Sequence, residues 1–331
     1  MKYFHNILIV IVLLVFSMED LQGQTCCSGG IPIAGNLAFE NNRKNAWQFG
    51  LMGDVNELNT LKSGEFVLKN QTSERDIYSL LFRTGYNITD NLVGGAVIPL
   101  VRQERRVTSG TNIFYSFTQG LGDIILFSQY QIPVNNLQNT YQVGMGWKLP
   151  TGDPAIKSQN GISYNMDMQP GSGSSDILFW GSYEHSFSGS PDLTLFTQLF
   201  YRLNGKYGQY LGDESYHFGN EWQIIPGLSK QWFISNQLFN TSVLLKLRNM
   251  KPNEINSSDI ANTGGFWFYA IPSITYHFNQ QISVSLAPEI PVYSDLQGTQ
   301  LTTTFRIRGG VSVNLNQPST VEEVKLKPLK K

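Results

Sequence analysis

The spacing of the connections along this chain constrains its fold more than any other feature. Between residues 45 and 315 we expect about twelve segments of alternating side chains, separated by breaks rich in Gly, Pro, Asn and Ser. Short breaks alternate with long ones without exception. The short ones fall at Thr89–Asn91, Pro133–Asn139, Phe187–Asp192, Ile234–Gln237 and Asn279–Gln281, and the long ones at Glu57–Glu74, Arg102–Gly122, Pro150–Ser174, Asn204–Ser215, Asn249–Gly264 and Ser294–Thr299.

A closed up-and-down barrel places tight turns on one rim and long loops on the other, which produces this alternation. A secreted β-sandwich with Greek-key crossovers has no reason to alternate so regularly. Because the series begins and ends beside a long loop, the number of strands is even and both ends of the barrel lie on the short-turn side. In a bacterial outer membrane that side is the periplasm, so we expect both termini there.

Within the segments, apolar and polar residues alternate with a period of two. Residues 78–88 read YSLLFRTGYNI and residues 141–149 read YQVGMGWKL. A period of two places one apolar and one polar face on each strand, and no segment has a convincing helical period of 3.6. The sequence therefore predicts an all-β fold, a closed antiparallel transmembrane barrel.

Composition agrees with a barrel that has lipid outside and a polar interior. Charged residues make up 15% of the chain and aromatic residues 12%, yet the mean hydropathy is only -0.19. We expect an aromatic girdle near the strand ends, from residues such as Tyr78, Tyr130, Trp147, Tyr201 and Tyr293. With a formal net charge of -1 the chain offers nucleic acid no general attraction, so we expect no nucleic-acid partner.

The first 23 residues have the pattern of a cleaved signal peptide. Lys2 precedes an apolar run at Ile7–Phe16, which is too short to span a bilayer as a helix. We expect export through this segment, then an N-terminal periplasmic segment or plug at 24–44, the barrel at 45–315 and a periplasmic tail at 316–331. These features together predict the outer membrane of a Gram-negative bacterium.

Charged side chains on the polar face are the candidate site. On the lipid face they would cost several kcal/mol near the bilayer midplane, so we expect them to line the lumen. They form either a hydrated passage that selects solutes or an ion-pair network that braces a narrow interior. The predicted pore-lining residues are Arg83, Asp123, Lys148, Arg202, Glu221, Lys246, Arg248, Arg306 and Arg308.

No catalytic constellation is visible in the sequence. His185 has an adjacent serine, Ser186, but the pair does not reproduce the His-x-Ser arrangement of outer-membrane phospholipase A. We therefore expect no enzyme, no cofactor and no metal. One alternative is a copper-handling role for the adjacent pair Cys26 and Cys27, whose sulfur atoms would suit Cu(I).

Three short motifs suggest a family. They are Gly120-Leu121-Gly122-Asp123, Leu149-Pro150-Thr151-Gly152-Asp153 and the Gly- and Ser-rich stretch Pro170–Asp176. Over about residues 75–315 the chain resembles the outer-membrane barrels of the phenol-degradation (MetA-type) pathway, described as transporters. The resemblance implies a porin-like barrel that passes small, apolar or aromatic solutes, with outer-membrane lipid as its other partner. The alternative is a structural or interaction barrel with a plugged lumen; the sequence does not predict an oligomeric state.

Overall fold

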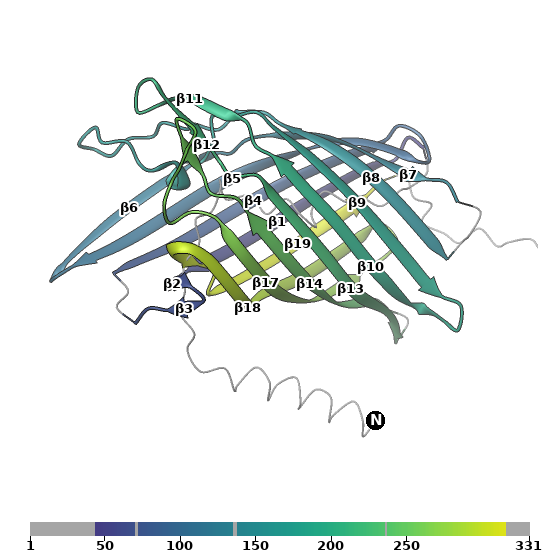
Figure 1. Ribbon diagram of the computed structural model, residues 1–331. Coiled ribbons are helices and arrows are strands. Elements are labelled where there is room, and N and C mark those ends of the chain that lie inside the picture. Colours follow the sequence, from purple (N-terminus) through teal and green to yellow (C-terminus); the bar gives the residue numbers. More distant parts are fainter. Residues whose placement is uncertain (1–43, 70–71, 135–137, 236, 316–331) are drawn as a thin grey trace, which may run out of the picture.

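The computed structural model describes residues 44–69, 72–134, 138–235 and 237–315 (Figure 1). Within this part of the chain, twelve antiparallel strands form the wall of a closed barrel. In sequence order they are β1 (Trp47–Leu58), β4 (Ser73–Asn87), β5 (Leu92–Ser109), β7 (Ile125–Ile132), β8 (Asn139–Lys148), β9 (Asp176–Phe187), β10 (Ser190–Leu203), β13 (Glu221–Ile234), β14 (Gln237–Met250), β17 (Gly265–His277), β18 (Ile282–Thr302) and β19 (Phe305–Asn314). The prediction of an all-β closed antiparallel barrel of about twelve strands is confirmed.

Neighbouring strands follow one another around the wall, and the barrel closes where the last strand pairs with the first. Strand β19 pairs with β1 over ten residue pairs, from Gln48 opposite Asn314 to Glu57 opposite Phe305. Both ends of the barrel sequence therefore lie at the rim with the short turns. Among the described residues, no helix is long and apolar enough to cross a membrane.

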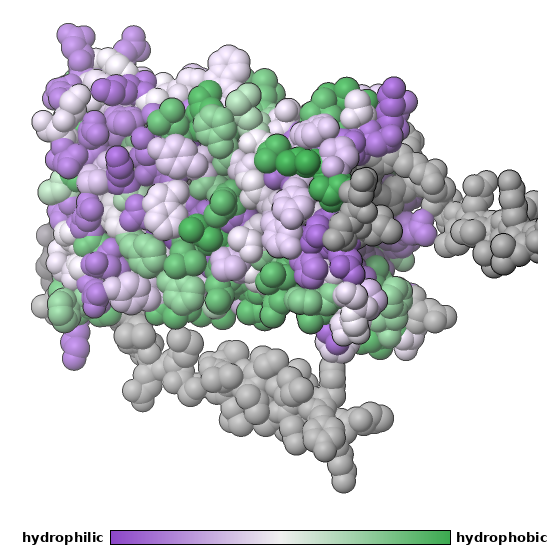
Figure 2. Space-filling model, turned by 45° about the vertical axis from the view of Figure 1, so that its right-hand side comes forward, coloured by the Kyte–Doolittle hydropathy of each residue, from purple (hydrophilic) through white to green (hydrophobic). Residues whose placement is uncertain are grey.

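The two faces of the wall carry the two halves of the alternating pattern. Leu199 on β10 is 54% exposed, whereas the preceding Gln198 is 1% exposed. Exposed apolar and aromatic side chains cover the outer face all round, and Figure 2 shows them concentrated across its middle, with hydrophilic residues gathered toward one end. The outer face is thus the one that alternation assigned to lipid.

The connections differ in size at the two rims, as predicted. Short turns join β4 to β5, β7 to β8, β9 to β10, β13 to β14 and β17 to β18. Most connections at the other rim contain secondary structure of their own: β2 (Thr60–Gly64), β3 (Phe66–Val67), β6 (Asn112–Leu121), the 3-10 helix η1 (Met166–Met168), β11 (Lys206–Tyr210), β12 (Glu214–His217), β15 (Glu254–Ile255) and β16 (Ser258–Asp259). Strands β11, β12, β15 and β16 form a separate four-stranded sheet.

Two of the predicted long loops are wrong in detail. The segment Arg102–Gly122 is a hairpin in which β5 continues beyond the wall and pairs with β6. The segment Ser294–Thr299 belongs to β18, and the chain turns only at 303–304 before β19. Both segments stay in strand conformation because β6 and β2 offer them backbone partners outside the wall, which the sequence pattern alone could not reveal.

Candidate functional site

The interior of the barrel is the candidate site, and the predicted charged residues lie on its inner face or at its rim. Asp123, Lys148, Arg202, Glu221 and Lys246 are all less than a tenth exposed. The remaining four, Arg83, Arg248, Arg306 and Arg308, are half-buried. Most of these nine residues meet in three ion-pair groups.

The first group joins four strands around Glu289 of β18. Its carboxylate pairs with Lys246 of β14 and lies 3.4 Å from Arg308 and 3.9 Å from Arg306. Arg306 also reaches Asp54 of β1 at 2.9 Å, across the junction of the first and last strands. The geometry fits the bracing interpretation here, because each carboxylate in the group is held by at least one cation.

The second group lies on β13 and β14. The Arg248 guanidinium donates two hydrogen bonds to Glu221, at 2.9 Å and 3.0 Å, and also lies 4.8 Å above the ring of Trp267. Arg202 of β10 is directly opposite Glu221 in the strand register. A two-point guanidinium–carboxylate pair is among the stronger ionic contacts in proteins, so this corner of the lumen is firmly held.

The third group fixes the rim where the three family-like motifs meet. Lys148 Nζ lies 2.8 Å from carboxylate oxygens of both Asp123 and Asp176. Asp123 also accepts hydrogen bonds from the backbone amides of Gly152 at 3.1 Å and Ser172 at 2.9 Å. The motifs are therefore a structural clasp at the start of the β8–β9 connection, rather than part of a passage.

Backbone contact within this clasp explains two of its glycines. Gly171 N donates a hydrogen bond to Asp153 O at 3.1 Å, and Gly171 lies against the backbone of Gly152. A methyl group on Gly171 would overlap the Gly152 backbone, so only glycine allows the two chain segments to approach so closely.

The middle of the β8–β9 connection crosses the mouth of the barrel. Asp167 lies 3.0 Å from Arg75 of β4 and 3.5 Å from Arg105 of β5. Gln103 of β5 donates a hydrogen bond to the Gln169 carbonyl at 3.0 Å. Arg75 is 1% exposed, so its contact with Asp167 is largely shielded from solvent.

The opposite side of the same connection packs against the small sheet. Met166 is buried against Tyr216 and Phe218. Ile255 and Ile260 of the β14–β17 connection pack against the same hydrophobic cluster. Burial, followed by the negative charges of Asp167 and Glu214, raises the pKa of Tyr210 in this cluster. Because its contacts extend from β4 to the β14–β17 connection, the β8–β9 segment spans this end of the lumen.

An apolar surface on the inner wall was not predicted. Inward side chains of β4, β5, β7, β9, β10 and β13 form one buried cluster, which comprises Leu81, Val93, Val97, Ile125, Phe127, Leu178, Trp180, Phe200 and Ile225. The indole of Trp180 covers Gly144 of β8, where a side chain would overlap it. Strand β5 is apolar on both faces, so the alternation in its sequence does not show which face points inward.

A cavity of about 250 Å³ lies in the lumen between the charged and apolar walls. It is lined from β4 and β19 on one side and from β10, β13 and β14 on the other, so it occupies the width of the interior. The cations Arg83, Lys246 and Arg308 line it together with the apolar side chains of Phe196, Ile225, Leu244 and Ile271. The site therefore combines a cationic side and an apolar side.

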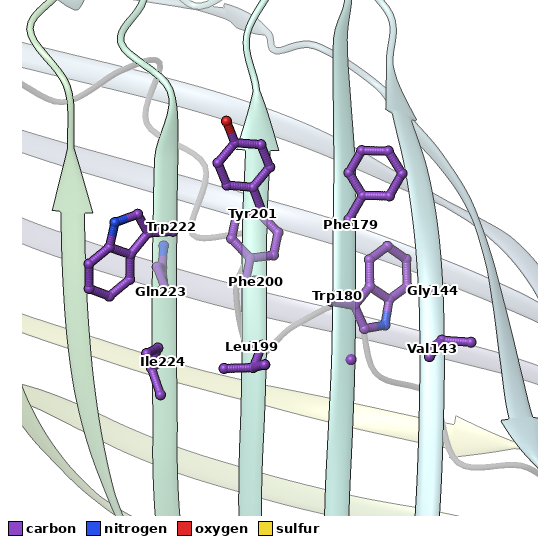
Figure 3. A pocket seen from close by; sticks show the side chains of 11 residues that line it. Val143, Gly144, Phe179, Trp180, Leu199, Phe200, Tyr201, Trp222, Gln223 and Ile224 are labelled. Carbon is purple, nitrogen blue, oxygen red and sulfur yellow. The ribbon is translucent and has the colours of Figure 1, made fainter.

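A second hollow, of about 510 Å³, lies on the wall at β8, β9, β10 and β13 (Figure 3). Gly181 leaves a gap between Val143 and Leu199, its partners in the adjacent strands. Above this gap Figure 3 shows Phe179, Tyr201 and Trp222 side by side on neighbouring strands, each more than a third exposed. Such a row of exposed rings has the arrangement expected of an interfacial girdle.

Among the described residues, His185 and Ser186 do not form a reactive pair. His185 Nδ1 lies 2.8 Å from Asn139 Oδ1, whereas Ser186 Oγ faces Thr194. Within the described ranges, no three His, Cys, Asp or Glu side chains gather in a way that could hold a metal ion. Cys26 and Cys27 lie outside the described residues, as do residues 24–43 of the predicted plug at 24–44.

Comparisons with known proteins identify the fold. No protein-family model and no curated protein matches the sequence. The crystal structure of the COG4313 outer membrane channel from Pseudomonas putida F1 superposes with a TM-score of 0.64 at 10% identity, covering 82% of this chain and 96% of that one. The beta domain of the Bordetella autotransporter BrkA gives 0.45 at 8% identity, covering 82% and 99%. The chain thus shares its barrel fold with an outer-membrane channel.

Proposed function

We propose that this protein is a passive channel in the bacterial outer membrane for small solutes with an apolar or aromatic part. The observation that carries the proposal is a closed barrel whose outer face is apolar and whose lumen holds a cavity between a charged and an apolar wall. Ion pairs hold most of the charged side chains of the lumen, and no catalytic role is proposed for them. The structural neighbour with a TM-score of 0.64 is an outer membrane channel, which supports the same proposal.

The proposal includes an orientation. The rim with long connections faces the outside of the cell, and the rim with short turns faces the periplasm, where both termini lie. Cysteines introduced at Lys157, Lys206 and Asn256, which are exposed on the first rim, should react with an impermeant thiol reagent on whole cells. A cysteine at Gln280 should not react, and the reverse labelling pattern would invert the orientation.

A second candidate is an interaction barrel with a closed lumen. The β8–β9 segment across the mouth favours it, because its polar and apolar contacts are buried on both sides. The proposed segment 24–44 could add a plug from the periplasmic side, and a copper-handling role for Cys26 and Cys27 is a further alternative. A channel requires either a path beside the β8–β9 segment or a movement of that segment.

Recordings from planar bilayers separate these candidates. The mature chain and a chain without residues 24–44 are reconstituted, and conductance and uptake of aromatic solutes are measured for both. Conductance in both chains supports the channel, and conductance only in the shorter chain supports a plug. If neither chain conducts, although its heat-modifiable gel mobility shows that the barrel is folded, the channel proposal is overturned.

A further inference from the structure

The lumen cavity has an excess of positive charge. Arg83, Lys246 and Arg308 line it, and no carboxylate does so among the described residues. Glu289, just outside the lining, is shared by Lys246, Arg306 and Arg308, and Asp54 pairs with Arg306. Among the described residues, the three cations Lys246, Arg306 and Arg308 thus share two carboxylates, which leaves one positive charge in excess. In an interior of low dielectric constant this charge attracts an anion more strongly than it would in water.

Hydrogen-bonding groups at the cavity also lack partners. Arg308 Nε, a donor, and Gln198 Oε1, an acceptor, are buried and have no hydrogen-bond partner among the described residues. Gln198 is 1% exposed and, like Thr275, lines the cavity. Buried polar groups usually have partners, so these two atoms point to a ligand or to ordered water in the cavity.

The size and the other wall of the cavity limit the ligand. Phe196, Ile225, Leu244 and Ile271 form an apolar side that would hold an apolar body in contact. The volume of about 250 Å³ exceeds the roughly 150 Å³ in which a benzene molecule can bind, leaving room for one small polar group on a ring. A simple inorganic anion would leave this apolar side uncovered.

We propose that the cavity binds small amphipathic organic anions, in which a carboxylate is attached to an apolar or aromatic body. The carboxylate lies against Arg308 and Lys246, and the body packs on the apolar side. The inference deepens the proposed channel function, since it assigns the class of solute that would occupy the lumen during passage.

Binding of benzoate to the full mature chain in detergent, measured by isothermal titration calorimetry, tests the site. Benzamide has nearly the same shape without the charge, and acetate has the charge without the ring. We expect benzoate to bind at least about tenfold more tightly than either, because charge-assisted hydrogen bonds and burial of the ring both contribute. Equal affinities for benzoate and benzamide would overturn the proposal, and this comparison requires no variant.

Variants locate the binding. Arg308→Gln should weaken benzoate binding by about tenfold, as expected for loss of a charged hydrogen-bond donor, and should leave benzamide binding unchanged. Lys230→Gln removes the same charge from an exposed position on β13 outside the cavity and should change neither. Unchanged benzoate affinity in a folded Arg308→Gln protein would place the binding elsewhere and overturn the assignment.

The same protein in planar bilayers keeps this inference separate from the channel function. Conductance without preferential benzoate binding would support the channel function and contradict the anion site. Benzoate binding without conductance of any solute would contradict the channel function and support the anion site.

Discussion

At the rim with long connections the barrel is closed by buried ion pairs, a hydrophobic cluster and a segment that crosses the mouth. At the other rim the chain reverses in a few residues and relies on local contacts. Thr89 Oγ1 accepts a hydrogen bond from the backbone amide of Leu92 at 3.0 Å, and Asn279 Oδ1 accepts one from the amide of Ile282 at 2.8 Å. The long-connection rim by contrast joins residues far apart in sequence, such as Arg75 and Asp167 at 3.0 Å.

This difference between the rims assigns two tasks of the proposed channel, entry and selection, to different parts of the molecule. The short turns only have to return the chain into the wall, so they contribute little to selection of a solute. The long connections cover one end of the lumen, so any barrier to entry should lie there. The cavity beneath this cover should determine which molecules are held. The following experiments test that division, from the largest expected effect to the smallest.

Removing the crossing segment should have the largest effect. Asp153 O and Gly171 N are already 3.1 Å apart, so residues 154–169 can be replaced by two glycines without stretching the chain. We expect single-channel conductance to rise severalfold, because the segment that spans the mouth is gone. Shortening the exposed tip of the β5–β6 hairpin, residues 107–114, to Asn-Gly is the control and should leave conductance unchanged. Equal conductance in both variants would mean that the segment is no barrier.

Lys148→Met should cost the most stability, because it leaves Asp123 and Asp176 buried without their shared cation. Breaking a buried pair in this way costs about 3–5 kcal/mol in the free energy of unfolding. Lys230→Met breaks the exposed pair with Asp192 near the short-turn rim, which should cost about 0–1 kcal/mol. Urea unfolding from lipid vesicles measures both, and similar losses would contradict the comparison.

One added methyl group at each rim provides a finer test. Gly171→Ala forces the methyl group into the Gly152 backbone, and such overpacking costs about 1–3 kcal/mol. Gly189→Ala, in the turn between β9 and β10, meets nothing within 4 Å and should stay within about 0.5 kcal/mol of the wild type. A destabilised Gly189→Ala protein would show that the short turns are more constrained than their contacts indicate.

The smallest effect concerns an exposed pair beyond the apolar band. The hydrogen bond from Arg102 lowers the pKa of Glu104 below its ordinary value of 4.5. A carboxyl group with a lowered pKa stabilises the folded state at pH values above its ordinary pKa. This stabilisation is lost as the pH falls through the lowered pKa. Glu104→Gln should therefore slightly reduce the urea midpoint at pH 7, and the difference from wild type should disappear in acid. A difference that persisted in acid would assign the effect to packing.

The barrel wall could be predicted from the sequence because its signal is local. In 78–88 every second residue from Tyr78 to Phe82 is apolar, and Tyr78, Leu80 and Phe82 are all exposed on the outer face. The polar residue Ser79 and the charged Arg83 point inward, as the alternation requires. Period and turn length together determined the number of strands and the rim to which each connection belongs.

The inner apolar wall and the mouth could not be predicted in the same way. Val93 and Val97 lie inside although their strand is apolar on both faces, so the period of two does not identify their side. The cover over Gly144 depends on the register between β8 and β9, and the contact of Asp167 with Arg75 joins residues 92 positions apart. Contacts of this kind follow from the closed geometry and leave no pattern in the sequence.

The junction between β1 and β19 has a consequence for how the chain reaches its folded state. Asp54 and Arg306 are 252 residues apart, so their strands can pair only after every intervening strand is available. Closing so long a loop is slow, and it exposes unpaired strand edges until the end.

The same junction discourages closure in the wrong register. A slip of one residue would turn the side chains of β19 to the opposite face, leaving the fully buried Asp54 without Arg306 at 2.9 Å. An isolated buried carboxylate is costly, so mispaired closures are less stable than the correct one. The ion pair therefore favours, late in folding, the one strand alignment that completes the barrel.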